Sequence, residues 1–311
     1  MQIFLQQLEL AAPLFALVLI GFLLARFRWW PRWLSTGLSK FVFVVALPAL
    51  LFRLMSGLAT LPAVDARLLL AFFGGCLAVF AIGRVWGRAA FGLDGVAQSV
   101  FALGGIFSNN VLLGVPLARA ALGKAALPAV ALILVFNTLL LWTLVTVSVE
   151  WARHGEFSLR GIGATLRSVL TNPIVAAILS GAMFGLAGGT LPALVDAPLQ
   201  FLGNAAAPLA LFVLGMGLAE YGMRQGWRAG LAITLLKLVV QPLAVWLLCR
   251  ALGLPKIETQ VAVLLAALPV GINVYLMSRE FRAMEGAVAT SILVSTALAA
   301  LTTPAVLALL T

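Results

Sequence analysis

The sequence predicts an all-α polytopic membrane protein, with ten transmembrane helices that form two inverted five-helix repeats. Three observations favour this fold: the composition, the number of long apolar runs, and a duplication that relates the two halves of the chain. Hydrophobic residues make up 63% of the 311 residues and charged residues only 10%. Soluble domains contain about 45–50% apolar and about 25% charged residues. We therefore expect the chain to fold within a lipid bilayer.

Ten apolar runs are candidates for membrane spans, because a spanning helix needs about 20 mostly apolar residues. The predicted spans cover residues 10–26, 36–54, 68–88, 95–122, 126–149, 168–188, 197–218, 229–251, 257–280 and 285–308. The longest polar connection separates spans 5 and 6. We therefore expect a first repeat over residues 1–150, a cytoplasmic connecting loop over 151–167, and a second repeat over 168–311.

The two halves share residues at a spacing of 160 positions, which drifts to 161–163 later in each half. The pairs that lie 160 positions apart are Pro13 and Pro173, Gly21 and Gly181, Pro48 and Pro208, Leu51 and Leu211, Phe52 and Phe212, and Gly57 and Gly217. Five spans per copy is an odd number, so the second copy must enter the membrane from the opposite side. Inverted repeats of this kind are typical of transporters and place the binding site near the middle of the bilayer, where the copies meet.

The net charge of +10 reflects basic residues that are dispersed among the loops, which argues against a nucleic-acid partner. The odd-numbered loops hold twelve Lys and Arg residues, whereas the even-numbered loops hold six. Because cytoplasmic loops are enriched in Lys and Arg, the odd loops are expected to face the cytoplasm and both termini to lie outside. The predicted location is the cytoplasmic (inner) membrane.

Spans 4 and 9 each carry polar and helix-breaking residues in the middle of an apolar run. These residues are Asn109, Asn110, Gly114 and Pro116 in span 4, and Pro269, Gly271 and Asn273 in span 9. Proline and glycine weaken a helix, so both spans are predicted to break and cross there. Each break exposes a half-helix N-terminus with about half a positive charge. The crossing would bind an anion; alternatively, these residues only kink two packed helices.

Four motifs resemble the auxin efflux carrier family, which includes bacterial permeases for malonate, malate and related acids. They are the run from Asn110 to Leu117, Thr171-Asn172-Pro173, the run from Ala207 to Gly215, and the run from Ala267 to Asn273. The resemblance covers the whole chain, although the large central hydrophilic loop of the long plant members is missing. It implies the ten-helix fold of the bile-acid and sodium-proton antiporter relatives.

The resemblance also implies a mechanism and a site. Spans 1, 2, 6 and 7 would form a scaffold that dimerises, and spans 3–5 and 8–10 a transport unit that moves in an elevator-type step. Pro116 and Pro269 would mark the crossover, and the substrate carboxylate would lie near Asn110 and Asn273. The implied partners are a small organic anion, the lipid bilayer and a second copy of the chain.

Other polar residues within the spans have alternative roles. Lys237 could neutralise the substrate or act in proton coupling, or it could satisfy a backbone carbonyl near the crossover. Gln241, one turn further along span 8, and Asn137 in span 5 are candidates for lining the cavity. Tyr275 could close over an aromatic substrate or simply pack, and Asn204 is expected to be structural.

Several chemistries are not expected. All ten acidic residues lie in or near predicted loops, so no intramembrane carboxylate is available for coupling, and proton, sodium and uncoupled transport stay open. Cys76 and Cys249 lack metal or disulfide spacing, and the single histidine, His154, lies in a loop. We therefore predict no enzyme, metal or cofactor. The expected function is secondary transport of an auxin-like acid or a dicarboxylate; a channel or a membrane sensor on the same fold is the alternative.

Overall fold

The computed structural model describes residues 2–27, 29, 31–57, 64–154, 171, 173–219 and 226–310. Throughout these residues the regular elements are helices. The predicted connecting loop over 151–167 lies outside the described residues except for its first four positions, which continue a helix. The first half contains α1 (Gln2–Arg26), α2 (Arg32–Phe41), η1 (Val42–Ala46), α3 (Leu47–Ser56), α4 (Arg67–Phe91), α5 (Gly95–Gly104), η3 (Asn110–Gly114), α6 (Val115–Leu122), η4 (Lys124–Ala126) and α7 (Leu127–His154).

The second half repeats this alternation of long and interrupted helices. It contains α9 (Pro173–Leu186), α10 (Ala193–Leu218), α11 (Trp227–Leu235), η5 (Leu236–Val240), α12 (Gln241–Ala251), α13 (Lys256–Ala266), α14 (Ile272–Phe281) and α15 (Glu285–Leu310). Among the described residues, each of the ten predicted ranges overlaps one of these helices or a consecutive set of them.

Six helical segments of the described chain are long and apolar enough to cross a membrane on their own. They are Trp33–Ser56, Arg67–Phe91, Lys124–Arg153, Ala193–Leu218, Trp227–Ala251 and Glu285–Leu310. The predicted spans 4 and 9 are missing from this set because each is divided into two short helices. The protein is therefore a multi-pass helical membrane protein, and the count of ten crossings and the inversion of the repeats stay predictions.

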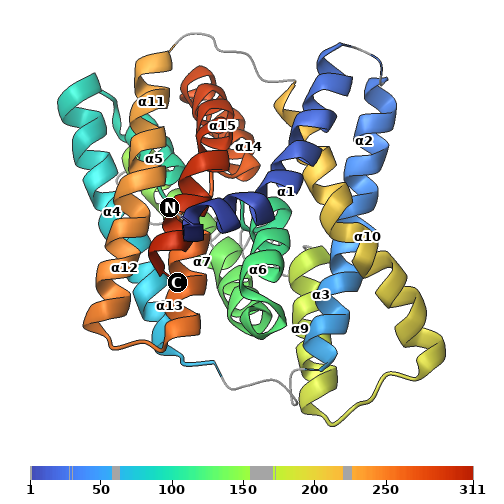
Figure 1. Cartoon of the computed structure of the whole chain (residues 1–311). Coiled ribbons are helices and arrows are strands. Elements are labelled where there is room, and N and C mark those ends of the chain that lie inside the picture. Colours follow the sequence, from blue (N-terminus) through green and yellow to red (C-terminus); the bar gives the residue numbers. More distant parts are fainter. Residues whose placement is uncertain are drawn as a thin grey trace.

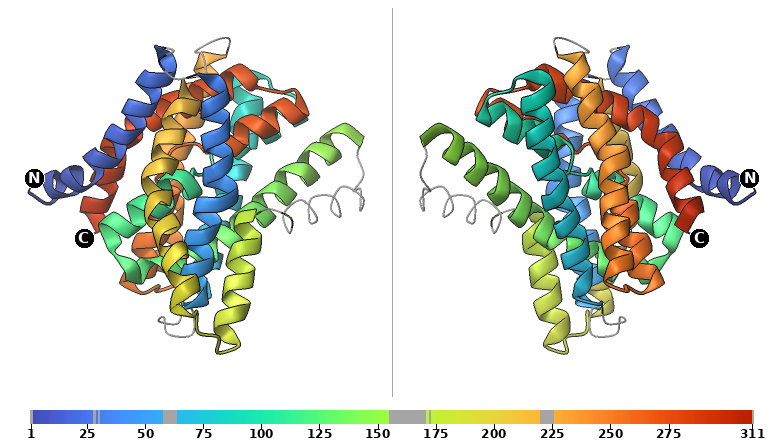
Figure 2. Two further views of the ribbon diagram at one scale, coloured as in Figure 1. Left: turned by 90° about the vertical axis from the view of Figure 1, so that its right-hand side faces the viewer. Right: turned by 90° about the vertical axis from the view of Figure 1, so that its left-hand side faces the viewer.

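The helices form two groups (Figure 1). In one group α1 packs along α10, and α3 packs against both α9 and α10. In the other, α4 packs against α5 and α12, and α11 packs against α15. Contacts of α1 with α15 and α6 join the two groups, and the turned views show α7 leaning away from the packed body (Figure 2).

Two contacts in the first group are reciprocal between the halves. A side-chain carbon at Gly21 on α1 would collide with the carbonyl oxygen of Phe212 on α10. One at Gly181 on α9 would collide with the carbonyl oxygen of Phe52 on α3. Gly21 and Gly181 are repeat mates, and so are Phe52 and Phe212. An exchange of two duplicated halves about a twofold axis requires such reciprocity, so these contacts support the predicted duplication.

Three proline-containing spans are wound more widely just before the proline. The π-helical segments η1, η3 and η5 are each followed two residues later by Pro48, Pro116 and Pro242, respectively. A proline ring clashes with the carbonyl of the preceding turn, and a π turn inserts one residue that moves this carbonyl away. These spans therefore stay helical through their prolines, because α3, α6 and α12 follow η1, η3 and η5 without a gap.

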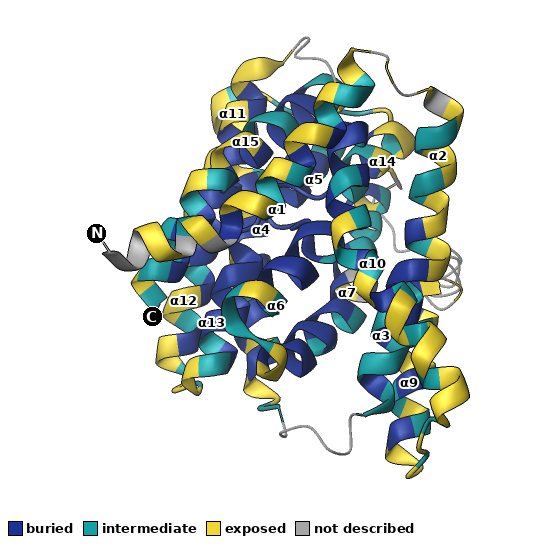
Figure 3. Ribbon diagram, turned by 45° about the vertical axis from the view of Figure 1, so that its right-hand side comes forward, coloured by how far each residue is buried: buried dark blue, intermediate teal, exposed yellow. Residues whose placement is uncertain are grey.

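Many residues on the outer sides of the helices are exposed (Figure 3), and a large share of them carry large apolar side chains. Examples are Leu19 on α1, Phe201 on α10 and Val239 on η5, which are 55%, 74% and 51% exposed. Exposing so much apolar surface to water would be energetically unfavourable, whereas the acyl chains of a bilayer would cover it. The buried residues gather on the inward sides of the helices, where spans 4 and 9 meet.

Candidate functional site

Spans 4 and 9 are both interrupted, and the two interruptions pair with each other. In span 4 the helix stops after Gly104 and resumes at Asn110, and in span 9 it stops after Ala266 and resumes at Ile272. Ser108 and Val270 form an isolated antiparallel bridge. The amide of Asn109 donates to Pro269 O at 2.9 Å, and that of Gly271 donates to Phe107 O at 2.8 Å. Each unwound segment thus satisfies polar groups of the other, as non-helical backbone at membrane depth requires.

The break in span 4 lies earlier than predicted. Its unwound residues are 105–109, so Gly114 and Pro116 lie within the helical segments η3 and α6, and their prediction as the break was wrong. The π turn before Pro116 removes the clash that would have interrupted the helix. A Cβ at Gly114 would lie 2.8 Å from side-chain atoms of both Leu265 and Leu268, so this glycine permits close approach to span 9.

The break in span 9 lies where the sequence predicted it. Pro269 and Gly271 both belong to the non-helical stretch between α13 and α14. A Cβ at Gly271 would lie 3.0 Å from Ser108 O, so the two unwound segments are in tight contact there. Pro269 contributes the carbonyl that accepts from Asn109.

Buried polar side chains surround this bridge. Asn109, Asn110 and Asn137 are 6%, 2% and 3% exposed, and Gln241 is fully buried. Asn110 Nδ2 donates to Asn137 Oδ1 at 3.3 Å, which links span 4 to α7. The structure therefore brings four of the predicted site residues together, one each from α7 and span 8 and two from span 4.

Several polar atoms at the crossing have no hydrogen-bond partner within the described part of the chain. They are Ser108 Oγ, Asn109 Nδ2, Asn110 Oδ1 and Gln241 Oε1. An unsatisfied buried polar group costs about 1–3 kcal/mol of stability, so a cluster of such groups indicates a functional role or a bound polar partner. Donors and acceptors are both present, and a polar ligand or water at the crossing would satisfy them.

The carbonyl ends of the two interrupted helices are capped by side chains from span 8. Lys237 Nζ donates to Ala266 O at 2.5 Å, at the end of α13. Gln241 Nε2 donates to Ile106 O at 2.8 Å, just beyond the end of α5. Helix C-termini carry unpaired carbonyls and a partial negative charge. The two donors each pair one of these carbonyls, and the ammonium group of Lys237 lies next to the negative end of α13. Of the roles considered for Lys237, the carbonyl bond is the one present in this structure.

The remaining predicted site residues lie on α14. Asn273 and Tyr275 are partly exposed, in the first turns that follow Gly271. Their contact with a substrate stays a prediction. Asn204, expected to be structural, is exposed on α10.

Sequence reasoning missed two hydroxyl groups at the crossing. Ser295 Oγ on α15 accepts a hydrogen bond from the amide of Val270 at 3.0 Å, and Ser108 Oγ is one of the unpaired atoms. The sequence contained a signal for Ser295, because Ser291 and Ser295 are four residues apart within an apolar span. In the structure both side chains are fully buried.

The described residues contain no group of three or more His, Cys, Asp or Glu side chains that could hold a metal ion. Cys76 and Cys249 are free and buried. Glu258, which was expected near a loop, is 7% exposed in the first turn of α13, so one carboxylate is buried near the end of a span.

The comparison with protein families decides the class. The model of the family described as "Membrane transport protein" matches residues 7–307. The chain belongs to this family. The match also confirms the resemblance to the auxin efflux carriers, and a transporter family is generally not an enzyme family.

Two relatives are similar to this chain over nearly their full length. One, from Rhizobium meliloti (strain 1021), is named "Putative malonate transporter" and is 28% identical over 308 residues, which cover 97% of this chain and 95% of the relative. The other is an uncharacterised transporter from Methanocaldococcus jannaschii, 23% identical over 287 residues, which cover 90% of this chain and 91% of the relative.

Proposed function

We propose that this protein is a secondary transporter that moves a small organic anion, either a dicarboxylate such as malonate or malate or an auxin-like acid. The observation that carries the proposal is the pairing of two interrupted helices around unsatisfied buried polar atoms. Membership of a membrane transport family supports the class of function, and the name of the R. meliloti relative supports the type of substrate.

The crossing favours a negatively charged substrate for two reasons. The helical segments that begin at Asn110 and Ile272 both start directly beyond the bridge, and the first amides of a helix have no intrahelical partner. Two such N-termini each contribute a partial positive charge. Asn109 Nδ2 has no partner among the described residues and adds a side-chain donor, so a carboxylate group could accept from these donors without an arginine in the site.

We further propose an elevator-type movement between the two groups of helices. The scaffold would consist of α1, α2 with η1 and α3, α9 and α10, and two scaffolds would meet in a homodimer. The transport unit would contain the remaining helices, including both interrupted spans and the span that caps them. We also propose that the protein lies in the cytoplasmic membrane. The odd-numbered loops, which are richer in Lys and Arg, would face the cytoplasm, and both termini would lie outside.

Transport by purified protein in proteoliposomes tests this function. We expect saturable counterflow of radiolabelled malonate or malate, which Asn110→Ala and Asn273→Ala should each weaken by removing amide groups from the crossing. Asn204→Ala is the matched control, because Asn204 is exposed on α10, and it should transport like the unmodified protein.

The outcomes separate the alternatives. Conductance without counterflow would favour a channel, and neither activity would favour a sensor. Unchanged affinity in both Asn110→Ala and Asn273→Ala, measured on folded protein, would remove the crossing as the binding site. Counterflow of indole-acetate in place of malonate would assign an auxin-like substrate.

A further inference from the structure

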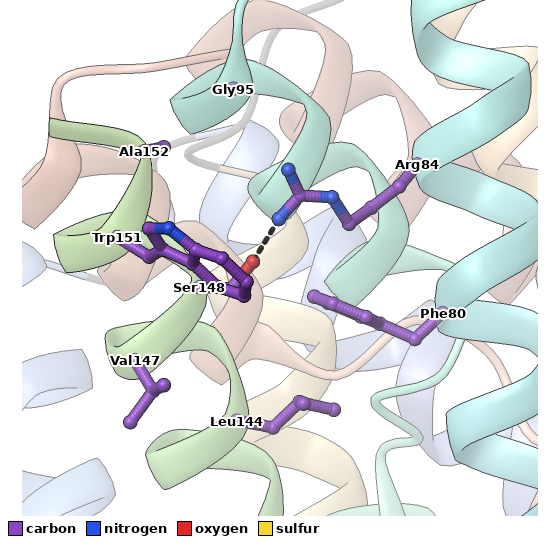
Figure 4. A pocket seen from close by; sticks show the side chains of 8 residues that line it. All are labelled: Phe80, Arg84, Gly95, Leu144, Val147, Ser148, Trp151 and Ala152. Atoms are coloured by element: carbon purple, nitrogen blue, oxygen red, sulfur yellow. Dashed lines mark hydrogen bonds between the residues drawn. The ribbon is translucent and has the colours of Figure 1, made fainter. Parts of the chain in front are cut away.

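A second polar cluster lies away from the crossing, between α4, α5 and α7. Arg84 on α4 donates to Ser99 Oγ on α5 at 3.1 Å and to Ser148 Oγ on α7. The two hydroxyl oxygens are 2.9 Å apart, and Ser99 also donates to Gly95 O at 2.7 Å. Figure 4 shows the guanidinium group projecting from α4 towards Ser148. The three helices are thus joined by one arginine and two hydroxyls.

Arg84 has no carboxylate partner within the described chain. The ion pairs found there join Arg53 to Asp196 and Arg67 to Asp65. A guanidinium has five N–H donors, and one nitrogen of Arg84 makes both of the bonds to the serine hydroxyls. The remaining donors and the full positive charge are therefore available to an anion.

Two acidic side chains belong to the elements that pack around Arg84. Asp94 accepts from the amide of Ala97 and caps the start of α5, and Glu150 lies two residues beyond Ser148 on α7. Neither forms an ion pair with Arg84 in the described part of the protein. Its charge is thus not neutralised by direct contact.

A cavity of about 540 Å³ adjoins the arginine. Apart from Arg84, Ser148 and the backbone of Gly95, its lining is apolar or aromatic: Phe80, Leu144, Val147, Trp151 and Ala152. A small soluble anion would leave most of this apolar surface in contact with water. A ligand with one anionic group and attached hydrocarbon chains would match both parts of the lining.

The cavity lies where a lipid head group would be found. Gly95 is the first residue of α5, Ala152 is two residues from the end of α7, and Arg84 is seven residues from the end of α4. At about 1.5 Å per residue, these positions place the guanidinium near one end of three neighbouring helices. Trp151 is 60% exposed beside it, and tryptophan is enriched at membrane–water interfaces.

We propose that this cavity binds the phosphate of an anionic phospholipid from the surrounding leaflet. The guanidinium of Arg84 and the hydroxyl of Ser148 bind the phosphate oxygens, and the acyl chains lie against the apolar lining. Arginine with phosphate forms strong charge-assisted hydrogen bonds, and basic pockets between transmembrane helices favour lipid head groups. The bound lipid would hold α7 against α4 and α5.

Ligand-dependent thermal stabilisation of the purified full-length protein in detergent tests the proposal. Phosphatidylglycerol is the probe, phosphatidylcholine the zwitterionic comparison, and inorganic phosphate the soluble anion. We expect phosphatidylglycerol to stabilise the unmodified protein and Arg84→Gln to weaken its apparent affinity by about tenfold, which corresponds to roughly 1.4 kcal/mol. Arg88→Gln is the matched control, since Arg88 is exposed one turn further along α4, and it should bind like the unmodified protein.

A second variant keeps the proposal testable if Arg84→Gln does not fold. Val147→Trp should fill the cavity without changing its charge, and it should also abolish the effect of phosphatidylglycerol. A photoactivatable phosphatidylglycerol should cross-link to α7 near Val147 and Trp151. Equal stabilisation by inorganic phosphate, equal affinity in Arg84→Gln, or cross-links confined to other helices would each overturn the proposal. None of these readouts depends on transport activity.

Discussion

Replacing Gly271 by alanine tests whether the two interrupted helices must touch at their crossing. The backbone of Gly271 (φ −74°, ψ 144°) is extended and open to any residue, so the effect of the substitution is purely steric. An added Cβ would lie 3.0 Å from Ser108 O and 3.0 Å from Phe107 Cδ1. The phenyl ring can turn aside, but the carbonyl oxygen of Ser108 belongs to the bridged backbone.

The magnitude follows from the bridge. Restoring an ordinary contact of 3.4 Å requires a separation of about 0.4 Å, which would stretch the hydrogen bonds at 2.8 and 2.9 Å to the limit of good N–H···O geometry. Each such bond contributes about 0.5–1.5 kcal/mol. We therefore expect Gly271→Ala to lower the free energy of unfolding by about 1–3 kcal/mol. A loss of the same size in ligand binding at the crossing would weaken the affinity by roughly 5- to 150-fold.

Thermal unfolding in detergent and malonate counterflow measure the two effects separately. Gly217→Ala on α10 is the matched control, because its Cβ would be 4.0 Å from Ile272 Cδ1, an ordinary contact. Alanine within a helix is favoured over glycine by up to about 1 kcal/mol, so this variant should be neutral or more stable. If Gly271→Ala unfolds and transports like Gly217→Ala, the tight contact inferred at the crossing is wrong.

Three further substitutions have defined outcomes. Lys237→Met should reduce stability by about 1–3 kcal/mol because Ala266 O loses its donor, whereas Lys40→Met, at an exposed position, should leave the unfolding temperature unchanged; equal effects would contradict the cap. Gly21→Leu should destabilise by about 1–3 kcal/mol or more, since its side chain meets the backbone of α10, and normal unfolding would refute that packing. Pro116→Ala should let the preceding π turn rewind and should lower the transport rate more than the yield of folded protein; an unaffected rate would show that this turn has no part in transport.

The extents of the helices could be predicted closely from the sequence because apolar length is a strong signal in membrane proteins. The predicted range 68–88 corresponds to α4 (Arg67–Phe91), and the predicted range 285–308 corresponds to α15 (Glu285–Leu310). The position of the break in span 4 could not be predicted, because Pro116 is the stronger helix-breaking signal in the sequence, whereas α5 ends at the pair Gly104 and Gly105. A proline interrupts a helix only if the preceding turn cannot widen, and that depends on packing against neighbouring helices.

The candidate site shows the same division. Asn109, Asn110 and Gln241 stood out as polar residues within apolar spans, and all three are buried at the crossing. The backbone carbonyls of Ile106 and Ala266 could not be identified, since every residue has such a group. Their importance depends on where each helix ends and which helix passes there, and both are tertiary properties.

The two caps constrain which parts of the protein can move together. Lys237 and Gln241 lie four residues apart on span 8 and hold the ends of both interrupted helices. Sliding the crossing past span 8 would leave two carbonyls unpaired at membrane depth, which is strongly disfavoured. The crossing and span 8 should therefore move as one body, together with α4, which packs along α12. A sliding surface would then lie where α1 meets α6 and α15 and where α10 meets α6, through side-chain contacts that can exchange without unpairing backbone groups.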